Sequence, residues 1–439
     1  MEISPQRRRE IIDALRRGTV PRSGLDVLAV GLEAFEPVLR EELAGVRAGG
    51  GVFKAVRGEY GCGKTFFARW LAEAAKRMGF AASEIQISET ETPLHRLETV
   101  YRRLMERLST ADSPSHAMGN VLDTWFFTLE EDVLAEGGTE PSDETELVAR
   151  TEALLEQRLA GVARVAPMFG AAIRGYRRAQ VAGDLAAAEA ILAWLGGQPN
   201  VAAQAKRLAG VKGDIDHFGA MNFLGGLLTI LRDCGNAGLL LVLDEVETVQ
   251  RMRGDVRDKS LNALRQLIDE VDAGKFPGLY LLVTGTRAFF EGPQGVQRLE
   301  PLAQRLHVDF QTEARFDNPR AVQIRLSPFD PERLRLVGRK VRDIYAADAA
   351  DPDRLLSLAD DAYVADLAAA VAGKLGGKVG IAPRVFLKKL VGEVLDRIDQ
   401  HPDFDPRKNY APTVSDAELT PVEREAAAAS NVDDIELRL

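Results

Sequence analysis

Residues 58–65 read GEYGCGKT and match the phosphate-binding loop pattern G-x-x-x-x-G-K-[ST] at every specified position. The three glycines let the backbone curl so that successive N–H groups point at phosphate oxygens. Lys64 supplies a positive charge for the β and γ phosphates, and the Thr65 hydroxyl suits a magnesium ligand. The loop therefore predicts binding of ATP with Mg2+. The candidate binding residues are Gly58, Glu59, Tyr60, Gly61, Cys62, Gly63, Lys64, Thr65 and Phe66.

The sequence on both sides of this loop supplies the context that the motif requires. Residues 51–57 (GVFKAVR) read as a short buried strand, and residues 65–78 read as a helix. A helix N-terminus that opens on a glycine loop attracts phosphate. The alternative is a glycine-rich turn that holds no ligand.

Length and composition set the class of protein. The 439 residues suit roughly three domains, or one large nucleotide-binding module with helical additions. Hydrophobic residues make up 46% and charged residues 28%, as in globular proteins with a sizeable core. No apolar run reaches the roughly 18 residues of a membrane span, and no secretory signal is apparent at the N-terminus. The two cysteines, Cys62 and Cys234, predict a reducing cytoplasm, and the net charge of −10 argues against nonspecific coating of nucleic acid.

A second nucleotide signature lies at residues 238–247, GLLLVLDEVE. The apolar run predicts a buried parallel strand whose carboxylates emerge at its C-terminal edge, where ligands bind in open α/β sheets. Asp244 is the candidate magnesium ligand, and Glu245 is the candidate base that orients and deprotonates the attacking water. Without the phosphate loop, the same pair would equally suit a strand followed by a helix cap. Two carboxylates favour ATP hydrolysis over binding alone.

A third strand is predicted at residues 279–285, and a further one at residues 322–326. When a strand lies between the loop strand and the carboxylate strand, a polar residue at its end contacts the γ-phosphate or the attacking water. Thr286 or Thr284 is the candidate for this contact, with Thr286 preferred. The alternative is a Thr-Gly-Thr turn that only ends the strand.

Residues 331–400 carry several helical patterns, and the last helix is predicted to open at residues 381–384 (IAPR). Arg384 at this start is placed to reach a bound γ-phosphate from a helical lid. The competing interpretation is a solvated surface arginine.

Residues 110–232 form a long, alanine- and leucine-rich interval that predicts an inserted helical subdomain, after a strand at 82–87 and a helix at 93–108. A basic cluster lies within it, and a solvated helix face is the preferred interpretation over a nucleic-acid surface. A neighbouring aromatic set is expected in the core of the insert. The cluster contains Arg174, Tyr176, Arg177 and Arg178, and the aromatic set contains Trp125, Phe126 and Phe127.

The predicted fold is an α/β P-loop NTPase with a parallel sheet, flanking helices, a helical insertion and a C-terminal helical lid. The expected parts are an N-terminal helical segment (1–50), an ATPase core (51–330) with an insertion at about 111–232, a helical lid (331–405) and an acidic, mobile tail (406–439). The N-terminal segment includes a basic amphipathic helix within residues 7–29.

The order of phosphate loop, Asp-Glu strand, threonine strand end and Pro-Arg lid helix resembles AAA+ and related STAND-type ATPases. Residues 51–73, 84–104 and 239–252 more narrowly resemble the BrxC/BrxD ATP-binding family of bacterial BREX phage-defence systems, and its shorter BrxD branch in particular. The resemblance runs from about residue 7 to residue 400, and ISETETPLHRLETVYRRL (87–104) is its most distinctive stretch. It implies a cytoplasmic ATPase that acts beside a superfamily 2 helicase or DNA-modifying partners against foreign DNA.

The AAA+ resemblance also implies site residues outside the main motifs. A segment before the first strand would place Val20, Pro21 or Val30 against the adenine. One of Arg305, Arg315 and Arg320 would reach the γ-phosphate of a neighbouring copy, which implies a homo-oligomer in the ATP-bound state. Arg305 is the preferred candidate.

Position 62 departs from the commoner small residues of such loops. A cysteine at a helix N-terminus beside Lys64 would have a lowered pKa and would be redox sensitive. The competing explanation is a small side chain that points away from the phosphates.

Three functions follow from these observations. The first is a magnesium-dependent ATPase that drives or licenses a DNA-acting defence complex. The second is a slowly hydrolysing, ATP-gated switch or scaffold that recruits a helicase or effector. The third is a DNA-loading factor, which would need a basic winged helix after residue 400, where the sequence is acidic instead.

Overall fold

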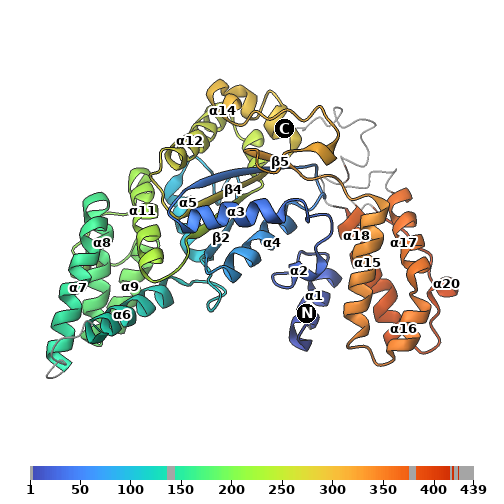
Figure 1. Ribbon diagram of the computed structural model, residues 1–439, viewed down its shortest axis with the longest axis horizontal. Helices are drawn as coiled ribbons and strands as arrows, with labels where there is room; N and C mark the ends of the chain where they lie inside the picture. The colour runs from blue at the N-terminus through green and yellow to red at the C-terminus, as the bar shows by residue number, and fades with distance from the viewer. Residues whose placement is uncertain (1–2, 136–143, 375–381, 416–417, 420–423, 425–439) are drawn as a thin grey trace.

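A parallel sheet forms the centre of the protein (Figure 1). The computed structural model describes residues 3–135, 144–374, 382–415, 418–419 and 424, and the sheet within them has five strands in the order β2–β3–β4–β1–β5. The strands are β1 (Val52–Arg57), β2 (Ala81–Gln86), β3 (Leu239–Asp244), β4 (Leu279–Gly285) and β5 (Gln323–Arg325). The predicted α/β class with a parallel sheet flanked by helices is therefore confirmed.

Strand β4 lies between the strand before the phosphate loop and the strand that ends in Asp244. Leu281 of β4 is in register with Phe53 of β1 on one side and with Leu241 of β3 on the other. Parallel strands place all their carboxyl ends at one edge of the sheet. The phosphate loop, Asp244 and Gly285 consequently meet at that edge.

Alternate side chains of the buried strands pack on opposite faces of the sheet. On β3, Leu239, Leu241 and Leu243 join the core on one face, while Leu240 and Val242 join the core on the other. The helices on the first face are α5 (Leu97–Arg107), α11 (His217–Asp233) and α12 (Gly254–Asp272), and those on the second are α3 (Glu36–Arg47) and α4 (Lys64–Arg77). The sheet is covered on both faces, which explains its continuous apolar strands.

Helix α5 begins later than the sequence predicts. The predicted helix spans residues 93–108, but its first four residues form a turn in which the Arg96 amide donates to the Pro93 carbonyl. Leu94 is nevertheless fully buried. The apolar periodicity is real, and the turn rather than a helix supplies the first contact.

A group of helices that lies between β2 and β3 in the sequence extends from one end of the sheet (Figure 1, left). Besides α11, it contains α6 (Met118–Ala135), α7 (Glu144–Val165), α8 (Pro167–Val181), α9 (Leu185–Leu195) and α10 (Ala203–Ala209). These helices occupy the interval in which the sequence predicts a helical insertion. Strand β2 pairs directly with β3, so the sheet is continuous without the helices of the insertion.

The aromatic set of this insert is only partly in the core. Trp125 and Phe126 are 1% and 2% exposed, but Phe127 is 58% exposed. The expectation was therefore wrong for Phe127. Consecutive helical residues point about 100° apart, and the third of three falls outside the buried stripe.

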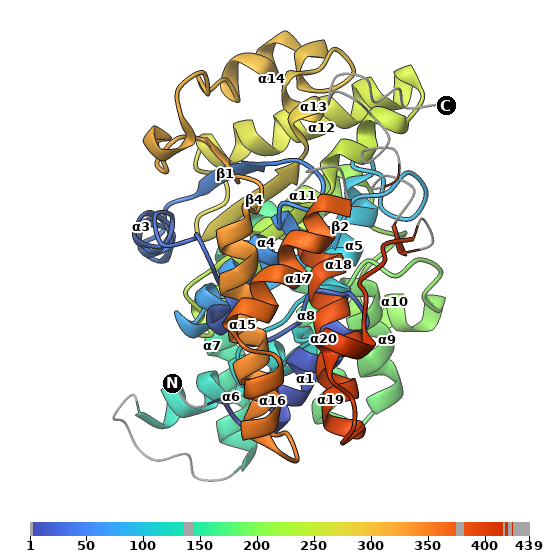
Figure 2. The same cartoon turned by 90° about the vertical axis from the view of Figure 1, so that its right-hand side faces the viewer.

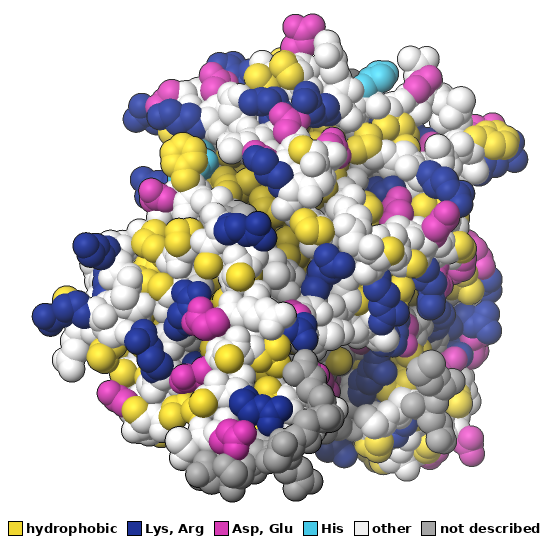
Figure 3. Space-filling model, turned by 60° about the vertical axis from the view of Figure 1, so that its left-hand side comes forward, with side chains coloured by type: hydrophobic (Ala, Val, Ile, Leu, Met, Phe, Trp, Pro, Cys, Tyr) yellow, Lys and Arg dark blue, Asp and Glu magenta, His cyan; other side chains and the backbone are white. Residues whose placement is uncertain are grey.

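The basic cluster of α8 is occupied by contacts within the insert. Arg174 forms an ion pair with Glu156, and Arg177 forms one with Glu130 while lying over the Phe126 ring. The Tyr176 hydroxyl donates to Asp123 at 3.1 Å. Basic and acidic side chains are interspersed on the face that carries the insert (Figure 3). The solvated-helix interpretation fits these contacts better than a nucleic-acid surface.

A second group of helices lies beside the carboxyl edge of the sheet (Figure 2). It contains α15 (Pro331–Ala346), α16 (Pro352–Leu358), α17 (Asp361–Lys374), α18 (Ala382–Lys389), a π-helical stretch (Leu390–Leu395), α19 (Asp396–Gln400) and α20 (Pro406–Asn409). The predicted start of the last long helix is matched by α18 from Ala382 onward, while residue 381 lies outside the described residues.

The N-terminal helix α1 (Pro5–Arg16) packs on these C-terminal helices. Ile11, Ile12 and Leu15 are buried in the same apolar core as α15, α17 and α18. Arg16 donates two hydrogen bonds to Asp396 at 2.7 and 2.8 Å. The predicted amphipathic helix is therefore α1, which ends at Arg16, before Pro21 and Gly24, and the short α2 (Leu25–Leu28) follows.

Within the described part of the chain, every helix is too short or too polar to cross a bilayer. Most of the predicted acidic tail lies outside the described residues. Glu418, one of the few described residues of this tail, forms an ion pair with the buried Lys389 of α18 at 2.6 Å.

Candidate active site

The phosphate loop connects the end of β1 to the start of α4. Gly61 and Gly63 have φ angles of 77° and 96°, a region that favours glycine, and a side chain at Gly58 would collide with the Cys62 sulfur. Helix α4 begins at Lys64 directly after this turn. The loop thus places a helix N-terminus, with its partial positive charge, at the edge of the sheet.

Lys64 is folded back onto its own loop. Its Nζ donates to the carbonyls of Gly58 at 2.9 Å and Glu59 at 3.2 Å, and it lies 5.2 Å from the centre of the Tyr60 ring. The side chain is 8% exposed. A bound phosphate would offer the ammonium stronger, charged acceptors than these neutral carbonyls.

A network of hydrogen bonds joins the loop to the ends of the two neighbouring strands. The Thr65 hydroxyl donates to Asp244 Oδ2 at 2.8 Å, and the Thr284 hydroxyl donates to Asp244 Oδ1. The Glu245 amide reaches both Asp244 Oδ1 and Thr284 Oγ1, at 3.2 and 3.3 Å. Asp244 is 4% exposed and is therefore held rigidly.

The pair of Thr65 and Asp244 fits a magnesium ion. Both side chains offer hard oxygen atoms, and Mg2+ in phosphate sites commonly takes one or two protein oxygens and completes its shell with phosphate and water. The hydroxyl and the carboxylate already lie within hydrogen-bond distance of each other. These two residues would hold the ion between the loop and β3.

Of the two candidate threonines, Thr284 is the one that contacts the Asp244 carboxylate. Thr286 is 3% exposed and caps helix α13 (Arg287–Glu291), since its hydroxyl accepts from the Phe289 amide at 3.3 Å. A contact of Thr286 with the γ-phosphate stays a prediction. The spacing alone could not separate two threonines on either side of one glycine.

Glu245 is hydrogen-bonded to a residue of the neighbouring strand. Its backbone has φ 59°, which is uncommon for a residue other than glycine. Its Oε2 accepts from the side-chain amide of Gln86 at 2.7 Å, at the end of β2. Gln86 has no role in the sequence analysis, because its position beside Glu245 depends on the pairing of β2 with β3.

A cavity of about 580 Å3 opens between this edge of the sheet and the C-terminal helices. It is lined by the loop from Tyr60 to Phe66, by Glu245 and Glu247, and by three other parts of the chain. These are the N-terminal segment within residues 15–35, residues 314–333 around β5, and the start of α18. Val20, Pro21 and Val30, the expected adenine contacts, all lie in its wall.

Glu247 was missed by the sequence analysis. It lies two residues after Glu245, in the short 3-10 helix η1 (Val246–Arg251), and is 6% exposed. Burial raises its pKa to about 7, although the nearby Lys64 acts to lower it. An acidic residue at this spacing was visible in GLLLVLDEVE, but the turn that aims it into the cavity was not.

Of the two explanations for Cys62, the structure fits the small side chain and not the lowered pKa. The thiol is 4% exposed, and burial raises its pKa although Lys64 and a backbone hydrogen bond act to lower it. Its side chain packs in the core between α4 and the sheet. A small buried side chain explains this position, and a reactive thiolate does not.

A protein-family model described as "BREX system ATP-binding protein BrxC/D" matches residues 3–414. The chain belongs to this family. A comparison with curated proteins found no match. The family match confirms the resemblance seen in the sequence, and it supports ATP binding within a phage-defence system.

The arginines of this BrxC/D family member lie at different distances from the cavity. Arg384 lines it from α18, and its Nη2 donates to the Glu418 carbonyl at 2.8 Å. Arg315 lines it from the other side. Arg305, on α14 (Glu300–Arg305), instead pairs with Asp269 of α12 at 2.5 Å, and Arg320 pairs with Glu41 at 2.6 Å.

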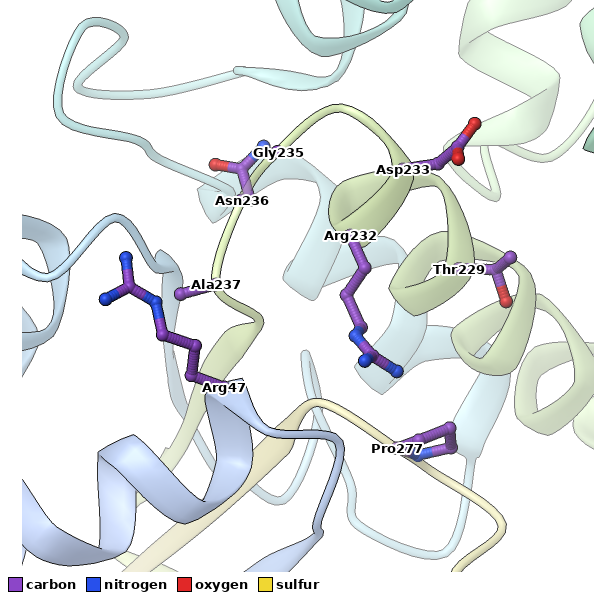
Figure 4. A pocket seen from close by; sticks show the side chains of 8 residues that line it. All are labelled: Arg47, Thr229, Arg232, Asp233, Gly235, Asn236, Ala237 and Pro277. Carbon is purple, nitrogen blue, oxygen red and sulfur yellow. The ribbon is translucent and has the colours of Figure 1, made fainter.

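A second cavity, of about 450 Å3, lies at the opposite edge of the sheet (Figure 4). Arg47 and Arg232 line it, but their guanidinium groups point in different directions. Arg47 donates to the Met78 carbonyl at 3.1 Å. None of the predicted site residues lies there, so the chemistry of the family is best sought at the carboxyl edge.

Proposed function

We propose that the chain is a magnesium-dependent ATPase whose cycle drives or licenses a DNA-acting defence complex. The observation that carries the proposal is the hydrogen-bonded network of Thr65, Asp244 and Thr284 beside Glu245. It brings a metal-binding pair, a candidate base and a polar strand end to one edge of a cavity that also contains the phosphate loop. This arrangement supports our assignment of the chain to the P-loop NTPases, and within them to the AAA+ type.

The roles of the side chains follow from their positions. Thr65 and Asp244 hold the metal, and bound magnesium neutralises charge on the β and γ phosphates. Lys64 binds the phosphates from the loop. Glu245 orients and deprotonates the attacking water, and Thr284 fixes the Asp244 carboxylate.

The arginine roles extend the site beyond the loop. We place Arg384 at the γ-phosphate of the same chain, because it lines the cavity from α18. We place Arg305 at the γ-phosphate of ATP bound to a second copy, since it does not line its own cavity and pairs instead with Asp269 of α12. This arrangement requires a homo-oligomer when ATP is bound, and a trans arginine accelerates such reactions by orders of magnitude.

The experiment is steady-state ATP turnover with and without Mg2+, and with and without double-stranded DNA. We expect turnover that requires Mg2+, that rises with DNA, and that is lost in Glu245→Gln. Retained turnover in Glu245→Gln would remove the proposed base. Arg305→Ala should retain ATP binding but lose the part of the rate that depends on protein concentration.

A second function, an ATP-gated switch that hydrolyses slowly and recruits a helicase or effector, is favoured by one observation. The Glu245 carboxylate accepts a hydrogen bond from the side-chain amide of Gln86. A base held by this contact would not activate water, so bound ATP would stay unhydrolysed until a partner broke the contact. Tight ATP retention with negligible turnover, with or without DNA, would support the switch over the motor.

A further inference from the structure

The carboxylate of Glu247 is a buried group that the proposed reaction leaves without a role. It lines the cavity at the phosphate loop, and no hydrogen bond from another described residue reaches either of its oxygens. Its nearest cation among the described residues is the Lys64 ammonium, with 3.9 Å between Lys64 Nζ and Glu247 Oε1. A buried carboxylate with so few partners is costly, and among the neighbouring side chains only this charge stabilises it.

The Lys64 ammonium is therefore shared among several acceptors before any nucleotide arrives. Two carbonyls of the loop accept its hydrogen bonds, the Tyr60 ring lies over it, and Glu247 balances its charge. All of these interactions draw the ammonium back toward the loop and η1. A phosphate in the loop would have to draw it away from them.

A bound triphosphate would change the surroundings of Glu247 in one direction. It removes the positive charge of Lys64 from the carboxylate and adds negative charge to a site that already contains Asp244 and Glu245. Both of these neighbours already act to raise the pKa of Glu247, and only Lys64 among the side chains acts strongly against them. The Lys64 ammonium thus cannot neutralise both the phosphates and Glu247 fully at the same time.

We propose that Glu247 is a positioning residue that competes with the phosphates of ATP for the Lys64 ammonium, and that it thereby weakens ATP binding. This inference rests on the proposed placement of the phosphates in the loop. Its ligand is the triphosphate of a nucleotide, and its action is on affinity rather than on the chemical step. A weakened affinity lets bound nucleotide leave the loop more readily.

The test is binding of a fluorescent, nonhydrolysable ATP analogue with Mg2+ to the full chain at pH 8, above the pKa of about 7 of Glu247, so that its carboxylate is ionised. Glu247→Gln keeps the shape of the side chain and removes its charge. We expect its Kd to fall by about fivefold or more, because the opposing charge lies close to the ammonium in a buried site. An unchanged or higher Kd in a variant that melts like the wild type would overturn the inference.

The matched control is Glu36→Gln, which neutralises an exposed carboxylate beside the cavity wall but outside it. Glu36 pairs with Arg40 at 2.7 Å rather than with Lys64. Its Kd should stay within about twofold of the wild type. An equal fall in both variants would show general charge repulsion and would also overturn the competition for Lys64.

Two further variants separate the possible failures. Glu247→Asp withdraws the carboxylate from Lys64 by one methylene, and it should also lower Kd, so it serves where Glu247→Gln does not fold. Lys64→Ala should abolish binding. Unchanged binding in Lys64→Ala would instead remove the phosphates from the loop, and with them the proposed active site, whereas lost binding there with an unchanged Kd in Glu247→Gln removes only the role of Glu247.

Discussion

The contact between Gln86 and Glu245 makes a direct prediction about the rate of ATP hydrolysis. The amide and the carboxylate are 2.7 Å apart, and a hydrogen bond to a charged group contributes about 1.5–3 kcal/mol when shielded from water. Gln86 is exposed and Glu245 is half-buried, so water competes and about 1 kcal/mol is the more realistic value. If Glu245 must leave Gln86 to reach the attacking water, Gln86→Ala lowers the barrier by this amount.

A barrier lower by about 1 kcal/mol corresponds to about fivefold faster turnover. The assay is phosphate release at saturating ATP, with ATP binding measured separately to show that affinity is unchanged. The matched control is Gln6→Ala, because the exposed Gln6 amide donates to Glu10 at 3.1 Å on α1 and neither residue lines the cavity. A rate in Gln86→Ala that is unchanged or lower would refute the reasoning, and would mean that Gln86 holds Glu245 in its working position.

Three further predictions follow from charges that the fold buries. Asp244→Asn should reduce turnover by about 100-fold or more, since it removes a metal ligand, and excess Mg2+ should not restore it; full activity would contradict the metal site. Glu42→Ala should lower the free energy of unfolding, measured in urea, by about 3–5 kcal/mol, because it removes the carboxylate that lies 2.6 Å from the buried Lys54 ammonium. Glu41→Ala, at the exposed neighbouring position, is the control and should lower it by less than about 1 kcal/mol. The raised pKa of Glu247, about 7, means that the folded protein binds more protons than the unfolded chain between about pH 4.5 and 7, so this group's contribution to stability is full below that range and is lost as the pH rises through it. The melting temperature of Glu247→Gln minus that of the nucleotide-free wild type should therefore be larger at pH 8 than at pH 6, and an equal difference would contradict the raised pKa.

The local motifs were predictable from the sequence because each is encoded within a few residues. The phosphate loop is a turn whose glycines are required by its own backbone, and Asp244 follows an apolar strand that has to be buried. The place of β4 between β1 and β3 agrees with the comparison to nucleotidases that have such a strand. The sequence therefore predicts the carboxyl edge of the sheet as the place of the nucleotide site.

The rest of the site depends on contacts between distant segments. Gln86 meets Glu245 across 159 positions of the chain, and nothing near either residue signals the other. The choice between Thr284 and Thr286 depends on which side of the strand end faces Asp244. The aim of Glu247 depends on the left-handed backbone at Glu245, which redirects the chain into η1.

The packing of α1 changes what the amino end of the chain is for. Its apolar side completes the core of the C-terminal helices, while Arg7 on the same helix donates to Glu73 of α4 at 2.9 Å. The segment between α1 and α3 then forms one wall of the cavity. Removal of residues 1–51 would consequently uncover the apolar core of the C-terminal helices, and it would also open the nucleotide cavity on one side. Probes or tags attached at the first residues will report on the C-terminal helices, although some 300 residues separate them in sequence.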